Sequence, residues 1–393
     1  MTLVTEVRNM LEKKLIPFWL SLRDTKYGGY LSYVDLELRR DPRAEKGCIL
    51  NSRILWFFSE AAMELGWKEL REAADHAYDF LMAHCLDREA GGVYWSVTYD
   101  GNPLDTTKHT YNQAFALYAL SAYYRLTKKP EVLETAQQLF DCMETHCRDA
   151  GGYLEAFDRF WQPVSNEKLS ENGVVAQRTM NTLLHVFEGY SGFYLASGSA
   201  RAAEEMRAIL QIWSEHVFQA EQQRQEVFFD REYHSLIDLQ SYGHDIETAW
   251  LLDWGCDMLQ DEALSGKIHG MTDILAVSVL EKGFDSEAVC NEREKGVTDT
   301  TRVWWVQSEA IVGFVHMLEK HPEQKRFGDA AAQIWRYILR ELVDPRENSE
   351  WFWQVDKAGK PVGKLTIVDP WKCPYHNGRM CLEMIRRNPD VSC

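Results

Sequence analysis

The chain has 393 residues, of which 45% are hydrophobic and 26% charged, so it has enough apolar material for a large buried core. Its 60 acidic and 43 basic residues give a formal net charge of -17, which repels nucleic acid and anionic lipid surfaces. We therefore expect neither nucleic acid nor a membrane as a partner.

The first segment and the cysteines point to a cytoplasmic protein. Residues 1–24 lack the continuous apolar run of a signal peptide or a membrane-spanning helix, because five charged residues interrupt them: Glu6, Arg8, Glu12, Lys13 and Lys14. The nine cysteines are scattered and contain no C-x-x-C pair, which argues against a disulfide framework and a thiolate zinc site. We expect reduced, mostly buried thiols.

The chain is a repeat of helical hairpins. Amphipathic helical patterns begin near Thr5, Lys68, Pro130, Ala200, Leu264 and Gln324. Each is followed by a loop and a more apolar helix, and these second helices begin near Asn51, Tyr111, Asn181, His244, Val303 and Pro374. The recurrence length is longer than that of the common open solenoids.

The loops within the hairpins combine turns with aromatic residues, as in Gly28-Gly29-Tyr30, Gly91-Gly92-Val93-Tyr94-Trp95 and Gly151-Gly152-Tyr153. Double glycine permits a sharp turn, and the aromatics that follow indicate short β-hairpin excursions. Six hairpins can close into a ring with no exposed end. We therefore predict an all-α fold, an (α/α)6 barrel, rather than an open solenoid, with residues 1–393 as one domain.

Polar residues lie near the starts of the apolar helices, where a purely structural barrel needs none. They occupy a similar phase of each hairpin, so ring closure predicts that they line one cavity at one mouth of the barrel. The set comprises Arg53, Tyr111, Asn112, Asn181, His185, His244, Glu247, Glu309 and His376.

Three imidazoles at equivalent positions are the informative part of this set. An isolated buried histidine is usually structural, and we interpret His76, His84, His146, His216, His269, His316 and His321 in that way. His244 and Glu247 are three residues apart, so we expect the carboxylate either to hold one nitrogen of the imidazole or to raise its pKa. Asp245 has the position of a helix-capping acid, and Asn181 shares a helix face with His185.

Imidazoles on opposite faces of a substrate carbon can remove a proton and return it with inverted geometry. The sequence has no P-loop, G-x-G-x-x-G, G-x-S-x-G or H-E-x-x-H motif, so we expect no cofactor and no metal. The C2 proton of an aldose becomes acidic once ring opening exposes the C1 aldehyde. The resulting enediolate needs stabilisation, for which Arg53 and His185 are suited.

Four segments resemble those of the cellobiose 2-epimerases, which belong to the N-acylglucosamine 2-epimerase superfamily. They are Lys108-His109-Thr110-Tyr111-Asn112, Ser241-Tyr242-Gly243-His244-Asp245-Ile246-Glu247, residues 301–307 and residues 371–379. The resemblance runs essentially end to end. It implies an (α/α)6 barrel and a cofactor-free inversion at C2 of the reducing-end glucose of a β-1,4-linked disaccharide.

The resemblance also implies roles for individual residues. His244 and His376 match an acid/base pair, and His185 matches the histidine that assists ring opening. The residues that match sugar-binding or stacking positions are Arg53, Tyr111, Asn181, Glu247, Trp304, Trp305, Glu309 and Trp371. The substrate would be a small disaccharide, and the protein a monomer or weak homodimer.

Other interpretations stay open at this point. An N-acylglucosamine 2-epimerase or an aldose–ketose isomerase would use the same superfamily architecture. A glycoside hydrolase would need two opposed carboxylates, for which Asp245, Glu247 and Glu309 are available. A metal site from His185, His244, His376 and Glu247, or a non-catalytic ring that binds a protein through its aromatic loops, are further alternatives.

Overall fold

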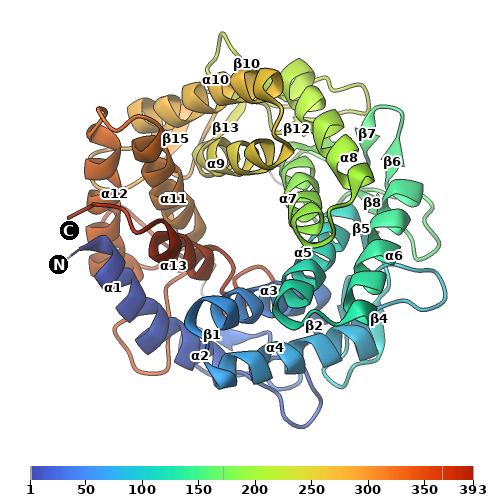
Figure 1. Ribbon diagram of the computed structural model, residues 1–393. Helices are drawn as coiled ribbons and strands as arrows, with labels where there is room; N and C mark the ends of the chain where they lie inside the picture. Colours follow the sequence, from blue (N-terminus) through green and yellow to red (C-terminus); the bar gives the residue numbers. More distant parts are fainter. Residues whose placement is uncertain (1, 171, 365, 393) are drawn as a thin grey trace.

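Six inner helices surround the centre of the molecule (Figure 1). The computed structural model describes residues 2–170, 172–364 and 366–392. The inner helices are α3 (Cys48–Leu65), α5 (Thr110–Thr127), α7 (Met180–Ser197), α9 (Tyr242–Leu259), α11 (Trp304–Lys320) and α13 (His376–Arg387). Most residues of their first turns are buried, and in α3 every residue from Cys48 to Ala62 is buried. This explains why the inner helices other than α13 are apolar without a strong amphipathic pattern.

The outer helices have one apolar and one charged face, because they separate the inner ring from solvent. In α4 the buried residues are Leu70, Ala73, Ala74, Ala77 and Phe80. The outer layer consists of α1 (Leu3–Met10) with α2 (Ile16–Leu20), α4 (Lys68–Phe80), α6 (Pro130–His146), α8 (Ala200–Ile212), α10 (Glu262–Ser278) and α12 (Arg326–Tyr337). Single π-helical turns follow or join several of them, at Leu11–Leu15, Leu81–Cys85, Trp213–Val217, Val279–Gly283 and Ile338–Leu342.

The predicted helical hairpins are confirmed. Each inner and outer helix begins no more than three residues from its predicted start, the largest difference being Cys48 against Asn51. Local chemistry explains this agreement. Pro130 occupies the first turn of α6, and the side chains of Ser199 and Asp261 accept hydrogen bonds from backbone N–H groups of α8 and α10.

Short antiparallel strands join each hairpin to the next. The strand directly before an inner helix pairs with the loop of the following hairpin: β2 (Lys46–Gly47) with β3 (Ser96–Val97), β5 (Lys108–His109) with β8 (Ala156–Phe157), β9 (Arg178–Thr179) with β12 (Phe228–Phe229), β13 (Leu239–Ser241) with β14 (Glu292–Glu294), and β16 (Arg302–Val303) with β17 (Gln354–Val355). Two additional strands extend these pairs: β4 (Pro103–Asp105) pairs with β3, and β15 (Val297–Asp299) pairs with β14. Two further pairs form local hairpins: β6 (Arg148–Asp149) with β7 (Gly152–Tyr153), and β10 (Phe218–Gln219) with β11 (Arg224–Gln225).

The same pairing closes the ring. β18 (Thr366–Val368), just before the last inner helix, pairs with β1 (Val34–Asp35) in the first hairpin. The N–H of Leu3 donates to the carbonyl of Val391 at 3.0 Å, and the two ends of the chain lie side by side (Figure 1). The predicted (α/α)6 barrel with short β excursions is therefore confirmed.

Some polar residues at the inner-helix starts hold loops rather than face a cavity. The Gln113 amide exchanges two hydrogen bonds with the backbone of Val93, at 2.7 and 2.9 Å, and Gln307 does the same with Val289. This contact excludes a side chain at Gly92, whose φ is +70° and whose Cβ would lie 2.7 Å from the Gln113 amide oxygen. The loops are thus fixed from the helix ends.

Two expectations from composition concern thiols and membranes. All eight cysteines in the described ranges are free, and only Cys142 among them is not buried; Cys393 lies outside these ranges. Among the described residues, no helix is both long and apolar enough to cross a bilayer.

The helices α12 and α1 meet where the ring closes, so removing a buried indole at this contact should greatly lower the stability of the fold. Trp335 of α12 is 0% exposed and donates from Nε1 to Glu6 Oε2 of α1 at 2.7 Å. We expect Trp335→Ala to lower the free energy of unfolding by about 3–5 kcal/mol. Trp67→Ala, at a side chain 37% exposed, should cost less than about 1 kcal/mol. Urea unfolding followed by circular dichroism measures both.

We propose that the chain is one domain, because each hairpin shares strands with both neighbours. The urea transitions seen by circular dichroism and by tryptophan fluorescence should then coincide. Two separated transitions, or equal costs for the two tryptophan variants, would contradict this view.

Candidate active site

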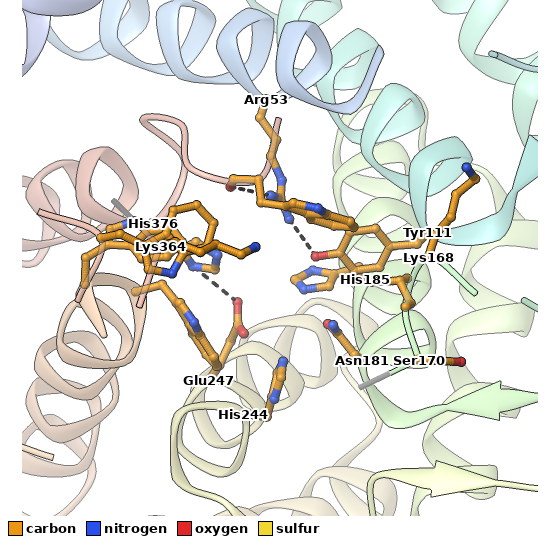
Figure 2. Close-up of a pocket in the computed structure, with 15 residues that line it drawn as sticks. Arg53, Tyr111, Lys168, Ser170, Asn181, His185, His244, Glu247, Lys364 and His376 are labelled. Carbon is orange, nitrogen blue, oxygen red and sulfur yellow. Dashed lines mark hydrogen bonds and ion pairs between the residues drawn. The ribbon is translucent and has the colours of Figure 1, made fainter. Parts of the chain in front are cut away.

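A cavity of about 320 Å³ opens where the N-terminal ends of the inner helices meet the loops. Every predicted site residue except Asn112 and Glu309 lines it, so the sequence correctly placed most of the set on one surface (Figure 2). The lining residues are Arg53, Tyr111, Lys168, Leu169, Ser170, Asn181, His185, His244, Glu247, Trp304, Trp305, Trp353, Lys364, Trp371 and His376.

The three imidazoles come from three different inner helices. His376 is the first residue of α13, His244 lies in the first turn of α9, and His185 lies one turn below Asn181 in α7. Figure 2 shows their rings directed toward the same space, with Glu247 between His376 and His244. Helix starts position these groups well because the preceding strands fix where each helix begins.

Two of the imidazoles are held by buried carboxylates. His376 Nδ1 lies 2.8 Å from Glu309 Oε1, and His185 Nδ1 lies 2.8 Å from Glu188 Oε2. A carboxylate bonded at Nδ1 favours a proton on that nitrogen, which leaves Nε2 as the basic atom on the cavity side of the ring. His244 differs, because its Nδ1 lies 2.8 Å from the hydroxyl of Ser241.

One buried guanidinium connects these carboxylates. Arg379, 1% exposed, donates from Nη1 to Glu188 Oε1 at 2.6 Å. Its Nη2 lies 2.7 Å from Glu309 Oε1 and also contacts Glu247 Oε1. Arg379 therefore links the supports of His185 and His376 to a carboxylate that lines the cavity.

Charge and burial set the protonation states of this cluster. Burial lowers the pKa of His244 to about 3, and the imidazoles of His185 and His376 act in the same direction. Burial also lowers the pKa of His376 to about 3, although Glu309 opposes this shift. For Glu309 itself, Arg379 and His376 outweigh burial and lower the pKa to about 2. Both histidines are therefore neutral bases near pH 7.

The structure corrects four predictions about individual residues. Asn112 is 0% exposed and donates to the carbonyl of Tyr94 at 2.7 Å, so it holds a loop instead of binding substrate. Glu309 lies beneath His376 and both its oxygens are occupied, one by Trp250 Nε1 at 3.0 Å. It therefore supports the imidazole and does not line the cavity.

The expected pair of His244 and Glu247 does not form, because Arg379 from another helix takes the Glu247 carboxylate. Asp245 does not cap its own helix either. It accepts from the Gln225 backbone N–H and from Gln240 Nε2 at 2.9 Å, which ties two loops to α9.

Several site residues were missed from sequence. Glu188 follows His185 by three residues, the same spacing that was applied to His244, so this signal was available. Arg379 gives no such signal, because its partners come from three other helices. The remaining missed residues are Tyr375 beneath the site and, in the lining, Lys168, Leu169, Ser170, Trp353 and Lys364.

The cluster also bears on metal binding. Ligand atoms of Glu247, Glu309 and His376 lie within 4.8 Å of one another, which is the grouping that a cation would need. Arg379 Nη2 contacts both carboxylates at this point. A cation there would face a fixed positive charge, so the donor set is poorly suited to a metal.

The chain is similar to known proteins over nearly its whole length. Residues 10–377 match the N-acylglucosamine 2-epimerase (GlcNAc 2-epimerase) family. A cellobiose 2-epimerase of Eubacterium cellulosolvens is 44% identical, over 98% of each chain. The crystal structure of a sugar epimerase from a ruminal bacterium is 44% identical and has a TM-score of 0.97, with 99% of this chain and 100% of that chain covered.

A further solved structure is similar over its whole length. Cellobiose 2-epimerase from Bacillus thermoamylovorans is 42% identical and has a TM-score of 0.95, with 98% of this chain and 99% of that chain covered. The chain belongs to the N-acylglucosamine 2-epimerase family of carbohydrate epimerases.

The low pKa values give a spectroscopic prediction. His244 and His376 should stay neutral between about pH 8 and pH 5, because burial disfavours their charged forms. Nitrogen-15 NMR of labelled histidine, assigned with H244N and H376N, should show no proton uptake at either ring in that range. His376 should carry its proton on Nδ1. Uptake by either imidazole above pH 5 would contradict these protonation states.

Proposed function

We propose that the protein inverts C2 of the reducing-end glucose of β-1,4-linked disaccharides, converting cellobiose to glucosyl-mannose and lactose to epilactose. The observation that carries this proposal is the convergence of His244 and His376, from separate inner helices, on one cavity. The cellobiose 2-epimerases that are 42–44% identical support the choice of substrate.

The reaction begins with ring opening, in which His185 takes part through its Nε2, opposite the Nδ1 that lies on Glu188. One of His244 and His376 then removes the C2 proton, and a cis-enediolate forms. The other, after taking up a proton from solvent, returns it to the opposite face, while the first releases to solvent the proton that it removed. Ring closure then gives the epimer. Cofactor and metal are unnecessary, because carbon–hydrogen bonds are the only bonds exchanged at C2.

Arg53 supplies the positive charge that stabilises the enediolate. Its guanidinium lines the cavity and is fixed by two contacts, a donation from Nη2 to the Tyr111 hydroxyl at 2.6 Å and one from Nη1 to the Trp371 carbonyl at 3.3 Å. The ring of Phe115 lies 4.0 Å below it. A pre-positioned guanidinium stabilises developing negative charge without further reorganisation.

Indole rings at the mouth account for a second sugar unit. Trp304, Trp305, Trp353 and Trp371 line the cavity, and the rings of Trp304 and Trp353 are 4.5 Å apart. Aromatic faces stack on the apolar faces of sugars, so they offer area for a ring beyond the one that reacts. This favours a disaccharide over a single sugar.

A glycoside hydrolase is a weaker assignment. It needs two carboxylates that face the scissile bond, whereas Glu247 is the one carboxylate in the described cavity lining. We further propose a cytoplasmic monomer or weak homodimer, in keeping with the net charge of -17 and the free thiols.

A product assay tests the substrate. Cellobiose should give glucosyl-mannose, and lactose epilactose, with no nucleotide or metal added and after dialysis against EDTA. Chromatography of the products distinguishes the alternatives. Release of monosaccharides would indicate a hydrolase, a ketose product an isomerase, and faster turnover of N-acetylglucosamine or mannose another member of the family. Inertness toward all of these sugars would favour a non-catalytic ring.

Replacing His244 or His376 should remove nearly all epimerisation, because each general acid–base group contributes about 100- to 10,000-fold. Asn at each position is the suitable change, and circular dichroism checks the fold. His234→Asn, at an exposed side chain (77%), is the matched control and should keep full activity.

Deuterium oxide gives a sharper version of this experiment. The epimer should carry deuterium at C2, since the returned proton comes from an imidazole that exchanges with solvent. A variant lacking only the histidine that returns the proton should still exchange deuterium into unreacted substrate, because the remaining base can remove and replace a proton on its own face. Full activity of either single variant would refute the two-histidine mechanism.

A further inference from the structure

Three carboxylates share one arginine in the floor of the cavity. Glu188, Glu247 and Glu309 all contact Arg379, and each of the four side chains is at most 2% exposed. Three buried negative charges cannot be balanced by a single guanidinium, so a proton within the cluster lowers its free energy. The geometry shows which carboxylate carries it.

Glu188 and Glu309 have their oxygens occupied by donors. Glu188 accepts from His185, from Arg379 and from the Tyr375 hydroxyl at 2.5 Å. Glu309 accepts from His376, Arg379 and Trp250. Multiple donated hydrogen bonds stabilise the ionised form, so these two carboxylates hold the negative charge.

Glu247 differs from both. Its Oε1 contacts the same Nη2 of Arg379 as Glu309 Oε1 does, and it lies 4.0 Å from His376 Nδ1. Its buried Oε2 has no hydrogen-bond partner among the described residues. Glu247 is also the member of the trio that lines the cavity, and Figure 2 shows its carboxylate pointing toward the central space.

We propose that Glu247 is a neutral carboxylic acid in the free enzyme, and that its O–H donates a hydrogen bond to the C1 oxygen of the substrate when that oxygen becomes negatively charged. Burial and the neighbouring charge of Glu309 raise the pKa of Glu247 to about 8, which agrees with this assignment. The role in the reaction rests on the proposed function; the protonation of Glu247 does not.

The electron balance of the step is complete. A histidine takes the C2 proton, the electron pair of that C–H bond forms the C1=C2 bond, and the π pair of the C1=O bond moves onto the C1 oxygen. Glu247 donates its hydrogen bond to this oxygen and keeps its proton. Return of a proton to the other face of C2 reverses these shifts. A neutral acid held in an apolar site can serve as such a donor.

Infrared spectroscopy tests the protonation without any substrate. A difference spectrum of wild type minus Glu247→Gln at pH 6 should contain the carbonyl stretch of one protonated carboxylic acid. Glu155 and Asp245, whose pKa values burial raises to about 7, are present in both proteins and cancel. Absence of the band overturns the proposal. The band in a protein that does not epimerise disaccharides would leave the protonation standing and refute the proposed function.

Activity measurements test the hydrogen bond. In Glu247→Gln the amide oxygen should accept from Arg379, which places the NH2 group as a donor toward the cavity. We expect kcat to fall about 10-fold or less in this variant, and about 100-fold or more in Glu247→Ala, where the donor is lost. Equal losses in both variants would overturn the proposal, because a required carboxylate would be missing from each.

The pH profile provides a second readout. Activity of wild type should fall as pH rises through about 8, since ionisation of Glu247 removes the donor, and Glu247→Gln should lack this decrease. The titratable and charged groups that contact Glu247 or line the cavity with it are Glu188 and His185 of α7, His244 of α9, Glu309 of α11, Arg53 of α3, Tyr111 of α5, Tyr375, His376 and Arg379 beside and within α13, and Lys168 and Lys364 of the loops. These stay unchanged in the variant, so persistence of the decrease would overturn the assignment.

Discussion

The buried guanidinium of Arg379 is the contact on which the site depends. It comes from the last inner helix and reaches carboxylates on three others, α7, α9 and α11. Burying a charge is costly unless it is paired, so Arg379 and its ionised partners Glu188 and Glu309 favour the arrangement that brings these helices together, with Glu247 beside them. That arrangement also sets the spacing between His185 and His376, because each ring rests on a carboxylate that Arg379 holds.

The site is therefore asymmetric. His376 and His185 rest on ionised carboxylates, whereas His244 rests on the hydroxyl of Ser241, a neutral group. A carboxylate stabilises the imidazolium that forms when its histidine accepts a proton, and a hydroxyl does so less. The histidines that face the cavity thus differ in chemistry even though their positions in the repeat are similar.

Sequence reasoning succeeded where the determinants are local. The helix starts follow from capping residues and from the change between amphipathic and apolar patterns, as at Pro130 and Ser199. The shared phase of the hairpins was enough to place most site residues at one mouth. The same reasoning assigned Asn112 to the cavity, because helix phase alone does not separate residues that hold loops from residues that face substrate.

Sequence reasoning failed where the partner of a side chain comes from a distant segment of the chain. Glu247 was expected to bind the nearby His244, but its partner is 132 residues away, at Arg379. The loop residues Lys168 and Ser170 are placed by similar long-range contacts, among them the 2.9 Å pair of His109 Nε2 and Asn166 Oδ1. Such contacts depend on how the hairpins pack against one another, which no local pattern encodes.

Strands pair at the junction between the last and the first hairpin in the same way as at the other junctions, since β18 pairs with β1 as β16 pairs with β17. The two ends of the chain meet there, with Thr2 bridged to Ser392. The catalytic ring thus has a cyclic order but no required starting point. A circular permutant, with the old ends joined by a short linker and new ends opened in a turn between an inner helix and the outer helix that follows it, would keep every contact of Arg379 and all three histidines in place.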